Sequence, residues 1–194
     1  FEKDADKTVP PASLAKLMTM EVVFDGLASG RLNLTQTFTV SEDAWRRGGA
    51  PSGTSAMFAA LKSEVTLQNL IRGATVQVAN DACIIIAEGI AGGEAGFVEQ
   101  MNQRSRQIGL TSSRFVNSTG LPQDGQQVTM RDMAKLARHL IRTYPEQYKF
   151  YGEPEFTFEK WTFRNRNPLL SQTLGVDGLA LGFTEGVGFS IVVS

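Results

Sequence analysis

The sequence predicts an α+β fold in which a cluster of helices packs on an antiparallel sheet. Two observations predict it: apolar residues recur at helical spacing through the middle of the chain, and apolar and polar residues alternate near its end. The chain has 194 residues, 42% of them hydrophobic and 20% charged, which suffices for a core. Without repeats or low-complexity linkers, we expect one domain over residues 1–194.

The first helix is expected to start at Ser13, because two prolines precede it and proline fixes φ at turns and helix starts. Gly26 or Gly30 should end it. A second helix should begin at Thr66, and the segment 76–90 is apolar nearly all round, which is typical of a buried helix. Amphipathic patterns predict two further helices, over 94–108 and 129–142.

Extended segments and loops are indicated by alternation and by turn residues. Residues 33–40 should be a strand or extended, and 46–56, rich in Gly, Pro and Ser, should be a loop. Strand pairs are expected at 155–158 with 161–163, around Glu159 and Lys160, and at 179–183 with 188–193, joined by a turn at 184–186.

Composition excludes several function classes. With 19 Lys and Arg against 20 Asp and Glu, the net charge is −1, which is not the basic footprint of a nucleic-acid-binding protein. The single cysteine, Cys83, cannot form an internal disulfide or a cysteine-based zinc site, and the single histidine, His139, excludes motifs with two histidines. The longest apolar run, 82–87, is far shorter than the ~18 residues of a membrane helix.

Both ends of the chain suggest a truncated sequence. The first residues have neither the basic nor the apolar region of a secretory signal. The last residues, 189–193, read as a strand that stops while still apolar, whereas natural termini are more often polar. We expect a fragment, a processed form or an engineered sequence.

The main candidate for chemistry is the pair Ser13 and Lys16, which lie three residues apart at a helix start and therefore share a face. Free backbone N–H groups and positive potential at a helix N-terminus favour an attacking alkoxide and a developing oxyanion. A buried lysine has a lowered pKa, which suits a neutral general base. Alternatively, Ser13 is a simple helix cap and the S-x-x-K spacing arose by chance.

The segment 10–19 resembles the nucleophile segment of the serine D-alanyl-D-alanine carboxypeptidases, the low-molecular-mass penicillin-binding proteins. Blocks that resemble the family follow in order along nearly the whole chain, at 41–45, 70–73, 79–83, 87–88, 115–121, 131–134, 164–170 and 176–179. The resemblance implies a penicillin-binding or β-lactamase-like fold, here partial, because family members have more strands before Phe1 and after Ser194.

The same resemblance implies a serine-type carboxypeptidase that removes the terminal D-alanine of peptidoglycan pentapeptide stems through an acyl-serine intermediate. It implies β-lactams as covalent ligands, no cofactor, and a periplasmic or other extracytoplasmic location in a bacterial envelope. Contact with the membrane is expected only through segments outside this chain.

The resemblance also assigns roles to individual residues. Ser13 is the implied nucleophile, Lys16 the general base, and Asn80 the residue that orients the substrate amide. The backbone N–H groups of Ser13 and Phe183 are the implied oxyanion hole. The residues implied to bind substrate are Gly182, Phe183 and Thr184.

Two motifs depart from the family. Its S-x-N motif reads 78–80 here, with Val78 in place of the serine, and its K-T-G motif begins with Ala180 and Leu181. Losing a positioned proton-transfer group costs ~10²–10⁴-fold in rate. Losing each charge-assisted hydrogen bond to the substrate carboxylate costs roughly 1.5–3 kcal/mol. We therefore expect slow acylation of Ser13 and weak or absent turnover.

These departures leave alternatives open. The chain could be a catalytically dead homologue that serves as a peptidoglycan-binding or scaffold module. A β-lactamase is a weaker alternative, because the sequence offers no obvious glutamate for a deacylating water. The departures fit a degenerate paralogue as well as an engineered or truncated sequence.

Other reactive or aromatic side chains receive structural interpretations. His139 is expected on a helix surface, outside any catalytic triad, and Cys83 in the core as a small apolar residue. The tryptophans Trp45 and Trp161 are expected in core packing, although each could instead stack on a sugar.

Overall fold

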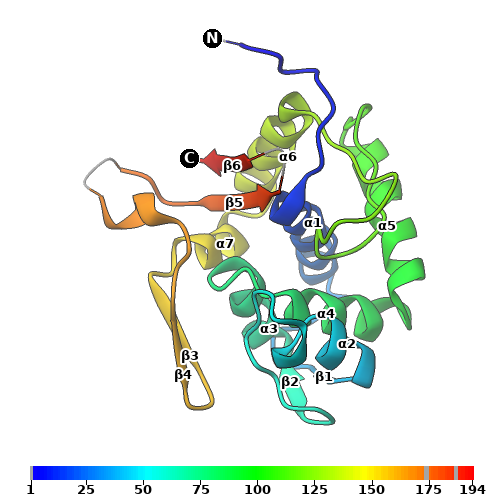
Figure 1. The fold of residues 1–194 in the computed structure, drawn as a ribbon, viewed down its shortest axis with the longest axis vertical. Helices are drawn as coiled ribbons and strands as arrows, with labels where there is room; N and C mark the ends of the chain where they lie inside the picture. Colours follow the sequence, from blue (N-terminus) through cyan, green and yellow to red (C-terminus); the bar gives the residue numbers. More distant parts are fainter. Residues whose placement is uncertain (1, 173–174, 186–187) are drawn as a thin grey trace.

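The computed structural model describes residues 2–172, 175–185 and 188–194 (Figure 1). The α-helices are α1 (Ala15–Ala28), α2 (Glu42–Arg47), α3 (Leu67–Thr75), α4 (Asn80–Ala91), α5 (Glu94–Gln107), α6 (Met130–Thr143) and α7 (Pro145–Tyr148). The strands are β1 (Thr37–Thr39), β2 (Glu64–Thr66), β3 (Glu155–Phe158), β4 (Trp161–Arg164), β5 (Leu179–Thr184) and β6 (Gly188–Val193). Short 3₁₀ helices are η1 (Ala12–Leu14), η2 (Ala50–Ser52), η3 (Lys149–Gly152) and η4 (Pro168–Ser171).

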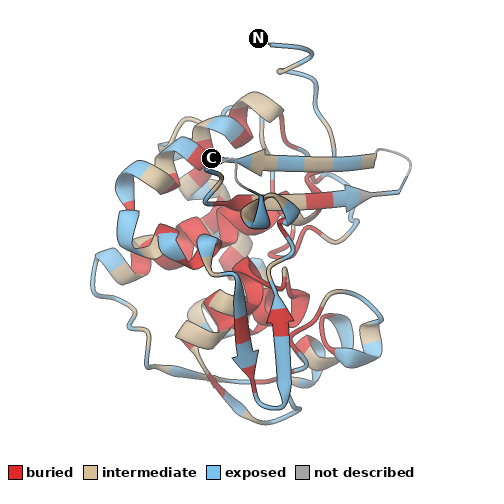
Figure 2. Ribbon diagram, turned by 90° about the vertical axis from the view of Figure 1, so that its left-hand side faces the viewer, coloured by how far each residue is buried: buried red, intermediate tan, exposed pale blue. Residues whose placement is uncertain are grey.

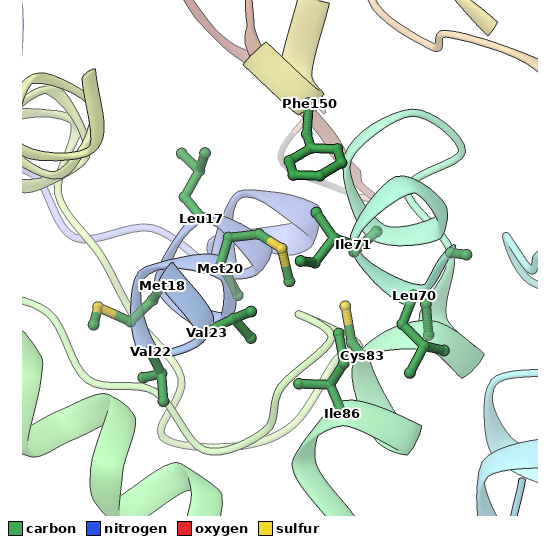
Figure 3. Close-up of a cluster of buried hydrophobic side chains, with 14 of the residues drawn as sticks. Leu17, Met18, Met20, Val22, Val23, Leu70, Ile71, Cys83, Ile86 and Phe150 are labelled. Carbon is green, nitrogen blue, oxygen red and sulfur yellow. The ribbon is translucent and has the colours of Figure 1, made fainter. Parts of the chain in front are cut away.

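Helix α1 is the centre of the molecule. All its residues from Ala15 to Phe24 are buried, and it contacts α3, α5 and α6 (Figure 2). Its apolar side chains meet those of α3, α4 and η3 in one cluster, in which Met20, Ile71, Cys83 and Phe150 lie close together (Figure 3). This burial on all sides explains why the α1 sequence lacks a polar face. The core position predicted for Cys83 is confirmed.

The predicted helices are present, and local capping explains their starts. The Oγ1 atom of Thr66 accepts a hydrogen bond from the backbone N of Asn69 at the start of α3. Thr129 caps α6 in the same way, with the backbone N of Asp132 at 3.1 Å. At the N-terminal end of α1, Ser13 lies in η1, so the expected helix begins with a 3₁₀ turn.

Two sequence predictions about helices were wrong. Helix α4 begins at Asn80 and not at residue 76, because Val78 has a φ of 60° and the backbone N of Ala79 donates to the carbonyl of Gly73. Residues 46 and 47 are helical and not loop, because they end α2. That helix is capped by Ser41 and has acidic residues in its first turn and arginines in its last.

The strands form three separate antiparallel pairs within the described residues, β1–β2, β3–β4 and β5–β6. Both strand pairs predicted in the last forty residues are confirmed, with Phe156 opposite Phe163 and Gly182 opposite Ser190. The predicted strand at 33–40 is shorter, spanning only β1. Gly186 of the predicted turn lies outside the described residues, and so does the side chain of Thr184.

The architecture is therefore α+β, with the β5–β6 pair lying across the helices. Strand β5 contacts η1 and η3, and β6 contacts α6 (Figure 1). Within the described residues, the sheet expected beneath the helices has these two strands. No helix in the described part of the chain combines the length and apolar character needed to cross a bilayer.

The remaining singled-out side chains have different environments. His139 lies on α6 with its side chain 24% exposed, and its Nε2 atom is 3.4 Å from Glu21 Oε1 on α1. Trp45 is partly buried against the core, whereas Trp161 is 42% exposed. The core-packing prediction was therefore wrong for Trp161. It shares a strand face with the buried Phe163, but it lies at the tip of a hairpin that extends away from the core (Figure 1).

Candidate functional site

Ser13 and Lys16 meet at the junction of η1 and α1. The Nζ atom of Lys16 donates a hydrogen bond to Ser13 Oγ at 3.1 Å and another to the backbone carbonyl of Thr119 at 2.6 Å. Lys16 is only 3% exposed. The three-residue spacing thus brings an amine into direct contact with a hydroxyl, and the carbonyl of a distant segment holds the amine in place.

The surroundings of Lys16 favour its neutral form. Burial lowers the pKa of Lys16 to about 8, although the nearby Cys83 and Asp81 act in the opposite direction. About a tenth of the amine is therefore uncharged at pH 7, far more than for an exposed lysine. An uncharged amine in hydrogen-bond contact with a hydroxyl can accept its proton.

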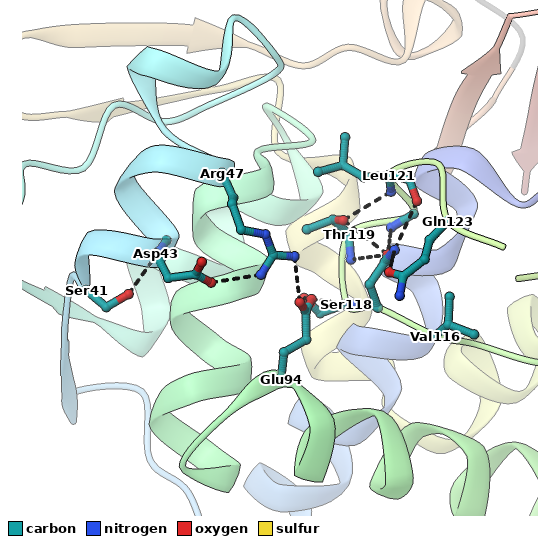
Figure 4. Close-up of polar contacts among 12 residues, drawn as sticks. Ser41, Asp43, Arg47, Glu94, Val116, Ser118, Thr119, Leu121 and Gln123 are labelled. Atoms are coloured by element: carbon teal, nitrogen blue, oxygen red, sulfur yellow. Dashed lines mark hydrogen bonds and ion pairs between the residues drawn. The ribbon is translucent and has the colours of Figure 1, made fainter.

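The carbonyl of Thr119 is positioned by a polar network (Figure 4). The side-chain oxygen of Asn117 accepts from the backbone N of Gly120 at 2.8 Å and from that of Thr119 at 3.3 Å. The backbone N and the hydroxyl of Ser118 both donate to Glu94. Glu94 in turn pairs with Arg47 of α2 at 2.8 Å, so the network connects the Lys16 contact to α5 and α2.

Glycines let two other segments approach Ser13 closely. A Cβ atom on Gly120 would lie 1.7 Å from the carbonyl oxygen of Ala12, and one on Gly182 would lie 3.2 Å from the backbone N of Ser13. Ala12 itself has a φ of 47°, a left-handed conformation that is uncommon outside glycine. Ser13 is therefore held between the 117–121 segment and strand β5.

Asn80 lies opposite Ser13 at the start of α4. Its side-chain nitrogen donates to Thr54 Oγ1 at 2.9 Å, and its backbone N donates to the carbonyl of Ser55 at 2.7 Å. An open pocket of about 580 Å³ is lined by Ser13 and Asn80 together with Gly182 and Phe183. The structure thus brings together the predicted site residues, apart from the Thr184 side chain, which is outside the described residues.

The three altered motif positions lie at this same site. Val78 and Leu181 line the open pocket, and with Ala180 they also line a small cavity of about 10 Å³ beside Ser13 and Lys16. Apolar side chains therefore lie next to Ser13 and Lys16. They supply neither a hydroxyl for proton transfer nor a charge for a carboxylate.

Sequence reasoning missed several groups that shape the site. Thr54, Ser55 and Arg166 line the open pocket, and Arg166 Nε donates to Gln77 Oε1 at 3.1 Å. Thr119 contributes a main-chain carbonyl, which no side-chain pattern can reveal. Arg166 lies within a block that resembles the family, and a charged residue in such a block could have been predicted to lie at the site.

Comparisons with known proteins show which family the chain resembles. The family model described as D-alanyl-D-alanine carboxypeptidase matches residues 1–194. The D-alanyl-D-alanine carboxypeptidase DacC of Escherichia coli is 42% identical over 195 residues, which cover 100% of this chain and 49% of the relative. The chain spans about half the length of the curated relatives it matches.

Solved structures show the same fold. Penicillin binding protein 5 from Haemophilus influenzae superposes with a TM-score of 0.94 at 40% identity, covering 98% of this chain and 55% of that one. Penicillin-Binding Protein D2 from Listeria monocytogenes, solved in its ampicillin-bound form, gives a TM-score of 0.85 at 27% identity, covering 100% of this chain and 77% of that one.

Proposed function

The chain belongs to the D-alanyl-D-alanine carboxypeptidase family, and from this premise we propose that it is a serine-type D-Ala-D-Ala carboxypeptidase. In this proposal it removes the terminal D-alanine of peptidoglycan stem peptides. The observation that carries the proposal is the 3.1 Å contact between Lys16 Nζ and Ser13 Oγ inside a buried environment. That contact supplies a nucleophile together with its base.

The proposed reaction has two stages. Lys16 takes the proton of Ser13, and the Ser13 oxygen attacks the carbonyl carbon between the two D-alanines. The backbone N–H groups of Ser13 and Phe183 stabilise the oxyanion, and Asn80 orients the substrate amide. The protonated Lys16 returns the proton to the leaving amine, and a water molecule later hydrolyses the acyl-Ser13 ester.

The rate of this enzyme is proposed to be impaired by its apolar motif positions. Val78 cannot relay a proton, which costs ~10²–10⁴-fold. Ala180 and Leu181 cannot bind the terminal carboxylate of the substrate, which costs roughly 1.5–3 kcal/mol for each lost charge-assisted bond. The oxyanion hole consists of main-chain groups, so acylation of Ser13 should persist at a reduced rate.

A second candidate function is favoured by the same three residues. A homologue that has lost turnover would serve as a peptidoglycan-binding or scaffold module. Such a protein would keep the fold, but with Val78, Ala180 and Leu181 it would lack the side chains needed for turnover. The two candidates differ in one measurable quantity, the release of D-alanine.

The proposal extends to ligands and location. The ampicillin-bound relative supports β-lactams as covalent ligands of Ser13. Because the relatives are bacterial carboxypeptidases and penicillin-binding proteins, we place the whole protein in the extracytoplasmic compartment where peptidoglycan lies.

The decisive test is the mass of the chain after incubation with a labelled penicillin. We expect an adduct on Ser13 that accumulates slowly, and none on the Ser13→Ala variant. An adduct that formed stoichiometrically within seconds would contradict the impairment, and no adduct after hours would contradict the nucleophile.

Release of D-alanine from a diacyl-Lys-D-Ala-D-Ala peptide then separates the two candidates. Release above that of Ser13→Ala supports the enzyme. Acylation without release supports the second candidate. The combined variant Val78→Ser, Ala180→Lys and Leu181→Thr should raise the rate by at least tenfold if the lost side chains limit it.

A further inference from the structure

A groove outside the Ser13 pocket has an aromatic floor. It is formed by the tip of the β3–β4 hairpin and the segment 56–63, and its volume is about 710 Å³. The rings of Phe58 and Trp161 lie 5.0 Å apart in it and are 37% and 42% exposed. Two large aromatic side chains therefore face solvent together, in a space of the size of a small-ligand site.

The fold holds Phe58 in this exposed position at a conformational cost. Its φ is 62°, in the left-handed region, where a non-glycine residue is strained by about 1–3 kcal/mol. The buried carboxylate of Asp81 accepts hydrogen bonds from the backbone N atoms of Met57 at 2.9 Å and Ala59 at 3.3 Å, on either side of Phe58. The ring also lies 6.0 Å from Phe163 of the hairpin. The backbone on both sides of Phe58 is thus held by a buried side chain.

Polar groups surround the aromatic floor. Ser63, Glu159 and Lys160 line the groove, and the Nζ atom of Lys160 lies 5.4 Å from the centre of the Trp161 ring. Such an exposed cation–π contact is worth only about 0.5–1 kcal/mol, so a ligand can displace it. The site therefore offers two aromatic rings, inclined at 46° to each other, with hydrogen-bond donors and an acceptor beside them.

This combination matches the chemistry of a sugar ring. A pyranose presents C–H groups on its faces, which stack on aromatic rings, and hydroxyl or amide groups around its edge. A purely apolar partner would make no use of the exposed charged groups of Glu159 and Lys160, whereas a sugar can form hydrogen bonds with both. The observations favour a saccharide over an apolar peptide.

The groove and the Ser13 pocket are lined by neighbouring parts of the chain. Ala50 lines the groove and Gly53 lines the pocket, so only two residues lie between the two linings, at most ~11 Å of chain. Asp81, which holds the Phe58 segment, directly follows Asn80 of the pocket. A stem peptide is bonded to a glycan strand, so a peptide in the pocket brings its glycan near this groove.

We propose that the Phe58–Trp161 groove binds the glycan strand that carries the stem peptide, as a site for β-linked N-acetylhexosamine units. The proposal rests on the proposed function for the identity of the glycan. In this proposal, Trp161 and Phe58 stack on a sugar ring, while Lys160 and Glu159 form hydrogen bonds with its hydroxyl and acetamido groups.

Binding of chitotetraose, a soluble N-acetylglucosamine tetramer, tests the groove directly. Ligand-observed NMR with the 194-residue chain should show saturable binding. The affinity should fall by tenfold or more in Trp161→Ala and in Phe58→Gly. The latter removes the ring while glycine accepts the left-handed backbone, so it should fold. The matched control Phe189→Ala removes an aromatic ring that is 87% exposed on β6, and it should bind like the unaltered chain.

Two results would overturn the proposal: no saturable binding of chitotetraose, or equal affinity in Trp161→Ala. Chitotetraose lacks a stem peptide, so Ser13→Ala should still bind it. Failure of the proposed carboxypeptidase would then appear as missing D-alanine release with sugar binding intact. Failure of the groove would appear as a penicillin adduct without sugar binding.

Activity gives a second readout for an active chain. Trp161→Ala should lower D-alanine release from a glycan-linked pentapeptide several-fold more than release from the free diacyl tripeptide. Phe189→Ala should leave this ratio unchanged. An equal effect of Trp161→Ala on both substrates would contradict a role in glycan binding.

Discussion

At the scale of single residues, the reactivity of the site depends on one buried amine. Lys16 is inside the molecule because α1 is buried on all sides, and among the described residues its side-chain nitrogen donates hydrogen bonds only to the Ser13 hydroxyl and the Thr119 carbonyl. Removing an ammonium from water destabilises its charged form. The amine of Lys16 can therefore act as a base because it is buried.

The rate of Ser13 acylation should depend on the protonation of Lys16. Because burial lowers the pKa of Lys16 to about 8, the neutral and reactive form grows as pH rises through 8. We expect the acylation rate with a fluorescent penicillin to rise about tenfold per pH unit below pH 8 and then to level off. Time courses of adduct formation over minutes to hours between pH 6 and 10 check this, with Lys16→Met as the inactive control. A flat profile would contradict the role of Lys16.

Val78 is strained in its present conformation. It is β-branched and has a φ of 60°, where its side chain crowds the backbone. Asparagine tolerates this region, so Val78→Asn should raise the free energy of unfolding by about 1 kcal/mol. Urea denaturation measures the change. The matched variant Val98→Asn, in the regular helix α5, should bring no such gain, and equal effects of the two would argue against strain.

At the scale of elements, a buried ion pair ties three helices together. Glu21 of α1 is completely buried, and Arg104 of α5 donates to it at 2.6 Å. The hydroxyl of Tyr144, which follows α6, also donates to Glu21, at 3.3 Å. These contacts fix the position of α1, and with it the direction of Lys16, relative to α5 and α6.

Removing the cation from this cluster should destabilise the fold. Arg104→Met leaves the carboxylate of Glu21 buried without its charge partner, which should cost about 3 kcal/mol of unfolding free energy. Arg106→Met is the matched control, because Arg106 is an exposed residue of the same helix. Urea denaturation of both variants gives the comparison. Similar midpoints would show that the pair contributes little.

At the scale of the whole molecule, the described β5–β6 pair exposes an apolar face. Phe183 and Phe189 lie 4.7 Å apart and are 57% and 87% exposed, and Ile191 and Val193 follow on the same face of β6. Within the described ranges, β6 pairs with β5 alone. Exposed apolar edge strands favour pairing between chains.

The 194-residue chain should therefore self-associate as its concentration rises. Size-exclusion chromatography over a hundredfold range of concentration should show growth beyond the monomer. A lysine at the most exposed position, Phe189→Lys, should shift the chain towards monomer, because charge on an edge strand opposes pairing. A monomer at every concentration would contradict this expectation.

The sequence by itself was sufficient for features that depend on neighbours along the chain. Helical periodicity located α3, α5 and α6, and alternation located the strand pairs β3–β4 and β5–β6. The spacing of Ser13 and Lys16 predicted their contact, because residues three apart share a helix face. The core position of Cys83 followed from the apolar run around it.

Only the tertiary structure decided features that depend on distant segments. The late start of α4 goes with a contact to a distant segment, because the carbonyl of Val76 accepts a hydrogen bond from the backbone N of Arg166 at 3.0 Å. Trp161 is exposed because it lies at the tip of the hairpin, beyond the part that packs on the core. The alternation of residues within a strand does not reveal how far along the strand such packing extends. The carbonyl that holds Lys16 belongs to Thr119, 103 residues away. Local patterns report local energies, whereas main-chain contacts and solvent exposure are set by the packing of the whole chain.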